Sequence, residues 1–383
     1  MTKYIMHLVV GVLLATSLGW AVSNDNNQQQ RGSQSFTVTK GGRLELAISG
    51  GDIRITGWEK NEVAVKTMGI DEEDLQSLKM SQNGNTVRVR FHPSGGSSDV
   101  HFDISVPSQF DLDVQTSGGD IEIAGPLAGD LRGTTSGGNI RLGDLGGSIE
   151  LSTAGGDIQA GGIKGVLKLR TSGGDIRIKN VSEEADVSTS GGDITVEQAG
   201  KQLRARTSGG NVRIGDVGGD ANASTSGGNV EVGSVSGSAS LSTSGGDIDL
   251  KSASGTVKAS SSGGDLKLGK ISGTVEGSTS GGNIEAQLVS GKIGRSRLSS
   301  AGGDIKLLVP TDAKATIQAR IRVQGRWRTA SKEYDIVSDF KTDDYQKNED
   351  DQEIRATVNL NGGGEVVTLE TTNGNIEIRK ETR

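Results

Sequence analysis

The chain repeats one short corner motif, Gly-Gly followed by Asp or Asn and in most copies preceded by Ser, at an almost constant interval. The interval is 19 residues once, then 18 residues eight times, then 21 residues, as the positions of the Asp or Asn show: Asp120, Asn139, Asp157, Asp175, Asp193, Asn211, Asn229, Asp247, Asp265, Asn283 and Asp304. Such a sustained period is typical of a solenoid, in which each repeat forms one coil and stacks on the next.

Apolar and polar residues alternate between the corners. After Asp247, the apolar residues Ile248 and Leu250 alternate with Asp249, and a second alternating run covers 257–262. Alternation with a period of two predicts a strand with one buried face. Each coil is therefore expected to contain a short strand, a bend with one inward apolar residue, a longer strand and the corner.

Three rows of aliphatic residues recur in register and are expected to stack inside the coils. They are Ile140, Ile158, Ile176, Ile194, Val212, Val230, Ile248, Leu266 and Ile284 after the corner; Leu145, Ile163, Val181, Ala199, Val217, Val235, Ala253, Ile271 and Val289 at the bend; and Ile149, Leu167, Ala185, Leu203, Ala221, Ala239, Val257 and Val275 in the second strand. This pattern predicts an all-β fold, a single-stranded parallel β-helix or β-solenoid with coils of about 18 residues and irregular β caps at both ends.

Residue types fit a narrow core. No aromatic residue occurs from 111 to 326, because a ring would need a matching hole in the next coil. The threonine before each corner, for example Thr207, falls on the inward register and is expected to hydrogen-bond along the rod. The corner glycines are expected to supply positive φ angles, and the Asp or Asn side chains to bond their own turn amides.

Five segments follow from these patterns. Residues 1–23 have the charge, the apolar run and the small-residue cleavage pattern of a signal peptide, and the run is too short to span a bilayer. Residues 24–35 are predicted to be a disordered linker, 36–110 an N-terminal β coil and cap, 111–310 the repeat array, and 311–383 a C-terminal β cap. No transmembrane segment is expected after cleavage, and the chain is expected in the periplasm or at the cell surface.

The two caps depart from the repeat. A short helix is predicted at 71–80, strands at 86–91 and 100–106, and a return of the corner motif at 372–378. Aromatic residues gather in these segments, where a cap would bury them.

The recurrent SGGDI and SGGNI corners, the SGGDIRI segment at 49–55, the ISVP before the array and the NGNIEI near the end resemble a bacterial putative-adhesin family. This family is a β-strand-repeat domain of unknown function found in exported or envelope proteins. The similarity covers roughly residues 36–383 and implies a β-solenoid that binds a partner.

Catalytic and metal sites are weakly supported. His92 and His101, with Asp99 and Asp103 nearby, could form a metal pair, but two strand-edge histidines are the simpler interpretation. The outward residues two places after each corner often alternate in charge, which favours a solvated face over the cleft of a polysaccharide-acting β-helix. No catalytic residue, cofactor or metal is therefore predicted.

Calcium binding by a β-roll is a sharper alternative, although four of the eleven corners carry Asn rather than Asp. Ice binding would need a flat outward threonine array, whereas the outward positions carry Lys168, Arg170, Arg204 and Arg206. The net charge of −7 disfavours nucleic-acid binding.

One basic segment near the end could contact a partner: Arg320, Arg322, Arg326, Trp327 and Arg328. The acidic segment 343–353 could instead pair with it. The sequence thus favours a non-catalytic exported envelope or surface rod that binds a protein or glycan. The alternative is a structural scaffold that associates end to end.

Overall fold

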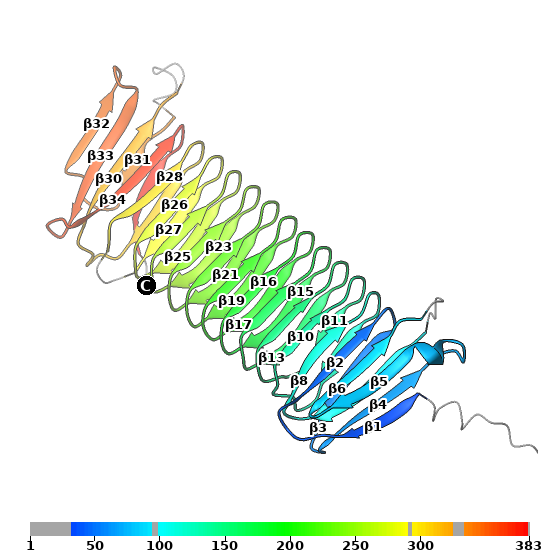
Figure 1. Ribbon diagram of the computed structural model, residues 1–383. Coiled ribbons are helices and arrows are strands. Elements are labelled where there is room, and N and C mark those ends of the chain that lie inside the picture. Colours follow the sequence, from blue (N-terminus) through cyan, green and yellow to red (C-terminus); the bar gives the residue numbers. More distant parts are fainter. Residues whose placement is uncertain (1–31, 94–98, 290–292, 325–332, 382–383) are drawn as a thin grey trace, which may run out of the picture.

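The computed structural model describes residues 32–93, 99–289, 293–324 and 333–381. Figure 1 shows a rod of stacked coils with a group of longer strands at each end. Two sheets face each other along the rod, and their inward side chains form one aliphatic core. The predicted all-β parallel β-solenoid is therefore confirmed.

Most neighbouring strands come from successive coils and pair in parallel. In the described residues, sheet A contains β1 (Ser33–Thr37), β3 (Asp52–Trp58), β4 (Glu62–Met68), β7 (His101–Pro107), β9 (Ile121–Ala124), β11 (Ile140–Leu142), β13 (Ile158–Ile163), β15 (Ile176–Val181), β17 (Ile194–Ala199), β19 (Val212–Val217), β21 (Val230–Val235), β23 (Ile248–Ala253), β25 (Leu266–Ile271), β27 (Ile284–Leu288), β29 (Ile305–Val309), β31 (Ile336–Ser338) and β35 (Ile376–Lys380). Sheet B contains β2 (Gly42–Ile48), β5 (Leu78–Asn83), β6 (Thr86–Phe91), β8 (Phe110–Gln115), β10 (Leu131–Thr134), β12 (Ile149–Ser152), β14 (Leu167–Arg170), β16 (Ala185–Ser188), β18 (Leu203–Arg206), β20 (Ala221–Ser224), β22 (Ala239–Ser242), β24 (Val257–Ser260), β26 (Val275–Thr279), β28 (Ser296–Ser300), β30 (Ala315–Arg322), β32 (Asp344–Asn348), β33 (Glu353–Leu360) and β34 (Glu365–Thr372).

The three predicted inward rows are buried, with one correction. Equivalent residues of successive coils face each other, as Ile158 and Ile176 do. In the longer repeat that ends at 304, the register shifts, and Leu288 rather than Val289 takes the buried place opposite Ile271. The bend of that repeat therefore comes one position earlier than the period predicts.

At the N-terminal end, the outermost coil is not the first in the sequence. Strands β6 and β7 stack outside β2 and β3, which in turn pair with β8 and β9 of the array. Strands β5 and β4 then pair antiparallel with β6 and β7, and β1 covers β4. Phe91, Phe102 and Phe110 are fully buried here, whereas Trp58 is half-buried.

At the C-terminal end, likewise, the outermost coil is not the last one in the sequence. Strands β34 and β35 insert between the last array coil, β28 and β29, and an outer coil made of β30 and β31. The predicted return of the corner motif at 372–378 is confirmed, since Ile376 pairs with Ile305. Strand β33 pairs antiparallel with β30, and β32 pairs antiparallel with β33 to complete the edge of sheet B.

Two predictions for the flanks need correction or qualification. The helix expected at 71–80 is only a short 3₁₀ helix, η1 (Asp74–Ser77), because Leu78 already begins β5. The signal peptide and most of the predicted linker lie outside the described residues, and β1 begins at Ser33, inside the segment expected to be a linker. No helix in the described residues is long and apolar enough to cross a membrane.

Candidate functional site

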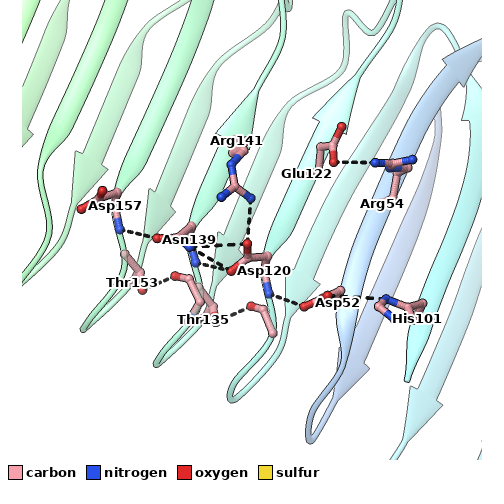
Figure 2. Close-up of polar contacts among 12 residues, drawn as sticks. Asp52, Arg54, His101, Asp120, Glu122, Thr135, Asn139, Arg141, Thr153 and Asp157 are labelled. Atoms are coloured by element: carbon pink, nitrogen blue, oxygen red, sulfur yellow. Dashed lines mark hydrogen bonds and ion pairs between the residues drawn. The ribbon is translucent and has the colours of Figure 1, made fainter. Parts of the chain in front are cut away.

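The repeated corner forms a continuous ladder of hydrogen bonds along one edge of the rod (Figure 2). The Oδ1 atom of Asp52 accepts the backbone N–H of Asp120 at 2.9 Å, Asp120 accepts that of Asn139 at 2.7 Å, and Asn139 accepts that of Asp157 at 2.9 Å. The same bond recurs in every coil as far as Asn375, whose Oδ1 accepts the N–H of Asp335 in the outer coil. The expectation that these side chains bond their own turn is wrong, because each one bonds the next coil.

The second glycine of each corner is required by close stacking. A Cβ atom on Gly210 would lie 2.1 Å from the carbonyl oxygen of Gly192 in the preceding coil, and the other corners give similar distances. The positive φ expected for the corner glycines occurs at Gly51 in the first coil, where φ is +105°, but the array corners do not adopt it. The prediction of a special backbone conformation is therefore wrong for the array.

The inward threonines tie each corner to its neighbour. The Thr153 hydroxyl donates to the carbonyl of Gly138 in the preceding coil at 2.8 Å and accepts the N–H of Gly156 at 3.3 Å. Ser261 makes both bonds in place of a threonine. The predicted bonding along the rod is confirmed, and the hydroxyls use backbone partners rather than each other.

The outward charges of sheet A pair with one another. Arg54 lies 3.0 Å from Glu122, and Arg141 lies 2.7 Å from Asp120, as Figure 2 shows. Burial alone would raise the pKa of Asp120, but the hydrogen bonds from Asn139 and Arg141 bring it below its usual range. Further pairs continue along the row: Arg177 with Asp175, Arg213 with Glu231, Lys267 with Asp249, and Lys306 with Glu285.

A shallow hollow of about 470 Å³ lies on this face, over Gly143 and Gly161. The hollow forms because Gly143 and Gly161 face outward and have no side chain to fill the space above them. Two of the cations beside it, Arg141 and Arg177, are bound to corner carboxylates at 2.7 Å. The charges at the hollow are therefore largely satisfied within the protein.

The two histidines lie at the first corner, each with its own partner. The Nδ1 atom of His92 is 2.6 Å from the hydroxyl of Ser49, and that of His101 is 3.4 Å from a carboxylate oxygen of Asp52 (Figure 2). Across the described ranges, no group of three or more His, Cys, Asp or Glu residues is placed to hold a metal ion. The structure thus supports two separate polar contacts at these positions.

The basic segment near the C-terminus is only partly described. Arg320 pairs with Glu370 and lies 3.8 Å from Glu353, while Arg322 lies 3.5 Å from Glu353. Glu353 belongs to the acidic segment that the sequence offered as a partner, whereas Glu370 comes from the neighbouring parallel strand β34. Arg326, Trp327 and Arg328 lie outside the described residues.

The Glu370 carboxylate is held by these arginines. Burial alone would raise its pKa, but the hydrogen bond from Arg320 and the charges of Arg320, Arg297 and Arg322 lower it below the usual glutamate value. The guanidinium groups of Arg320 and Arg322 therefore stabilise the C-terminal cap by pairing with its carboxylates.

A second group of cations lies on the outer face of sheet B, and we call it the basic cluster: Lys168 and Arg170 on β14, and Arg204 and Arg206 on β18. From the sequence, these residues were considered only as an argument against ice binding. The four residues face outward, and the two pairs are separated by 36 residues, which is two coils. This spacing is the sequence signal that could have grouped them on one face.

The fold and its surface define a class of protein, a single-chain parallel β-solenoid whose corner motif is structural. Within this class, the chain belongs to the toastrack DUF4097 family, whose sequence model matches residues 42–231 and 200–340. No curated protein matches the chain.

Solved structures with a similar arrangement share little sequence. A "putative adhesin" from Bacteroides fragilis NCTC 9343 has 10% identity over 91% of this chain and 96% of its own, with a TM-score of 0.23. A "putative cell adhesion protein" from Clostridium sporogenes ATCC 15579 has 8% identity over 91% and 99%, with a TM-score of 0.18. A "putative lipid binding protein" from Parabacteroides distasonis ATCC 8503 has 12% identity over 90% and 95%, with a TM-score of 0.24.

Proposed function

We propose that the protein is a non-catalytic, exported rod of the cell envelope or cell surface that binds a partner along its length, as an adhesin does. One observation carries this proposal. The corner Asp, Asn and Thr side chains, which could have served chemistry, form hydrogen bonds between coils, whereas the outward strand positions are exposed or half-buried from coil to coil. A stack of exposed, regularly spaced side chains is a surface suited to binding an extended partner.

The calcium alternative conflicts with the occupation of the corner carboxylates. Asp175 and Asp193 each give one oxygen to the backbone N–H of the next coil, and each lies beside an arginine, Arg177 or Arg213. A calcium site would need several of these oxygens free and turned toward one point. We therefore retain the binding rod as the proposed function.

The test is sedimentation of the full chain with envelopes isolated from a bacterium that encodes it. Saturable co-sedimentation is the expected result. If the chain stays in the supernatant at all concentrations and instead forms larger particles as concentration rises in analytical ultracentrifugation, the self-associating scaffold is the better description. Cell fractionation of a tagged chain checks export in the same strain, and retention in the cytoplasm would contradict the proposal.

A further inference from the structure

The basic cluster has a regular geometry. In the paired strands of sheet B, Arg170 and Arg206 stand on either side of Ser188, and Lys168 and Arg204 stand on either side of Asp186. Adjacent strands lie about 4.8 Å apart, so the two residues of each cationic pair are separated by roughly 10 Å along the rod. Lys168, Arg170 and Arg206 are exposed, and Arg204 is half-buried.

The charges of the basic cluster are compensated unevenly. Glu150 and Asp186 lie on either side of Lys168, whereas the neighbours of Arg170 and Arg206 in their own row are serines. Asp186 lies within the cluster, and its oxygen is 4.0 Å from Arg170, an exposed contact that contributes little. Within the described part of the chain, Lys168, Arg204 and Arg206 have no salt bridge, and the buried Nε of Arg204 has no hydrogen-bond acceptor.

Within the array, the row that contains Arg170 and Arg206 is free of carboxylates. We call it the hydroxyl row, because its other members in the array carry hydroxyl groups: Thr134, Ser152, Ser188, Ser224, Ser242, Ser260, Ser278 and Ser299. No carboxylate interrupts this line between Thr134 and Ser299, and Glu370, the neighbour of Ser299 on β34, ends it. An anionic ligand could follow it without meeting a like charge in the same row.

We propose that the basic cluster and the hydroxyl row bind an acidic polysaccharide laid along sheet B. The inference rests on the proposed function and names its ligand class. Guanidinium groups bind carboxylate or sulfate oxygens in a forked geometry, and the serine hydroxyls can both donate to and accept from sugar hydroxyls. The coil spacing of about 4.8 Å is of the same order as the length of one sugar unit, so successive units would meet equivalent positions.

The surroundings favour a polysaccharide over other polyanions. Binding to a membrane surface uses apolar side chains that enter the interface, but the exposed large apolar residues among those described, Met68, Val166, Val337 and Tyr345, all lie outside the hydroxyl row. Single-stranded nucleic acid is bound largely through aromatic stacking, and this row contains no aromatic residue.

The test compares two double variants of the full chain. R170S/R206S places serine, the common residue of the hydroxyl row, at both positions, so the fold should be retained. K179S/K251S removes the same charge from exposed positions of sheet A and serves as the matched control. Binding of polygalacturonate, heparin and neutral dextran is measured by isothermal titration calorimetry, with anionic vesicles and single-stranded DNA as further probes.

We expect the wild type to bind at least one acidic polysaccharide, more weakly as salt rises, and not to bind dextran. R170S/R206S should weaken this binding roughly tenfold or more, because two charge-assisted contacts are lost, and K179S/K251S should change it less than twofold. Equal binding by both variants, absence of binding to polygalacturonate and heparin, or tighter binding to DNA or vesicles would each overturn the inference. If R170S/R206S still sediments with envelopes as the wild type does, only the ligand assignment fails, whereas failure of the wild type to sediment defeats the proposed function.

Discussion

Replacement of Thr207 by Val tests whether the inward threonines stabilise the stack. The Thr207 hydroxyl donates to the carbonyl of Gly192 at 2.8 Å and accepts the N–H of Gly210 at 3.3 Å, and the side chain is only 7% exposed. Valine has nearly the same shape but offers neither bond. Two backbone groups would lose their partners, so the free energy of unfolding should fall by about 2–4 kcal/mol.

Thr207→Ser is the matched control, because Ser261 already makes the equivalent pair of bonds at 2.9 Å. Serine keeps the hydroxyl and removes one buried methyl group, which costs about 1 kcal/mol. Guanidinium denaturation followed by circular dichroism should therefore rank the wild type above Thr207→Ser, and Thr207→Ser above Thr207→Val. A valine variant as stable as the serine variant would refute a stabilising role for the hydroxyl.

Four further outcomes follow from the corners and the C-terminal cap. Asp193→Ala should lower the unfolding free energy by about 1 kcal/mol and Asp193→Asn by less than half of that, since only Asn keeps the Oδ1 acceptor, as denaturant titration can show. Gly210→Ala should cost about 1–3 kcal/mol, because its Cβ would meet backbone at 2.1 Å, whereas Gly209→Ala, at 3.2 Å, should cost less. Excess EDTA or millimolar calcium should leave the thermal transition unchanged, and a lost transition in EDTA would mean that the corners bind metal. The lowered pKa of Glu370 contributes stability above the ordinary glutamate pKa that is lost as pH falls through the lowered value, and Glu370→Gln should remove this part of the pH dependence of melting.

The sequence was sufficient for the core of the array because every repeat imposes the same register. Once Ile194 and Leu203 are assigned to the inward face, the residues 18 positions away must follow, and the structure buries them. The one exception, Leu288 in place of Val289, occurs where the repeat length changes, and the period no longer determines the register.

The partners of the corner residues could not be read from the sequence. An Asp or Asn after two glycines can bond its own turn or the next coil, and local preference favours the turn. The close distance between coils decides the outcome: the Oδ1 of Asp175 reaches the N–H of Asp193 at 2.8 Å. The same close distance explains why the second corner residue is glycine. Glycine is needed there because a Cβ atom would collide with the carbonyl of the preceding coil, not because φ is positive.

The order of the coils at the two ends was equally hidden. The motif at 372–378 indicated another corner. It did not indicate that β34 and β35 lie between the last array coil and the outer coil formed by β30 and β31. This arrangement also brings Glu370 beside Arg320, two residues 50 positions apart with no shared motif. By contrast, Glu353 could be anticipated, because an acidic segment following a basic one suggests pairing.

The division of labour within each coil indicates where function can reside. Inward and corner positions are constrained by packing and by bonds to the next coil, whereas the outward positions carry no such requirement. On sheet A, cations such as Arg141 and Arg177 are matched by nearby carboxylates, which supports the register of the stack. On sheet B, Glu150 and Asp186 lie on either side of Lys168. Arg206, by contrast, lies between two serines and has no salt bridge within the described residues, so register pairing does not account for its charge. A guanidinium group held on a rigid rod beside a row of hydroxyl groups, as that of Arg206 is, is better explained by a ligand than by the stability of the rod.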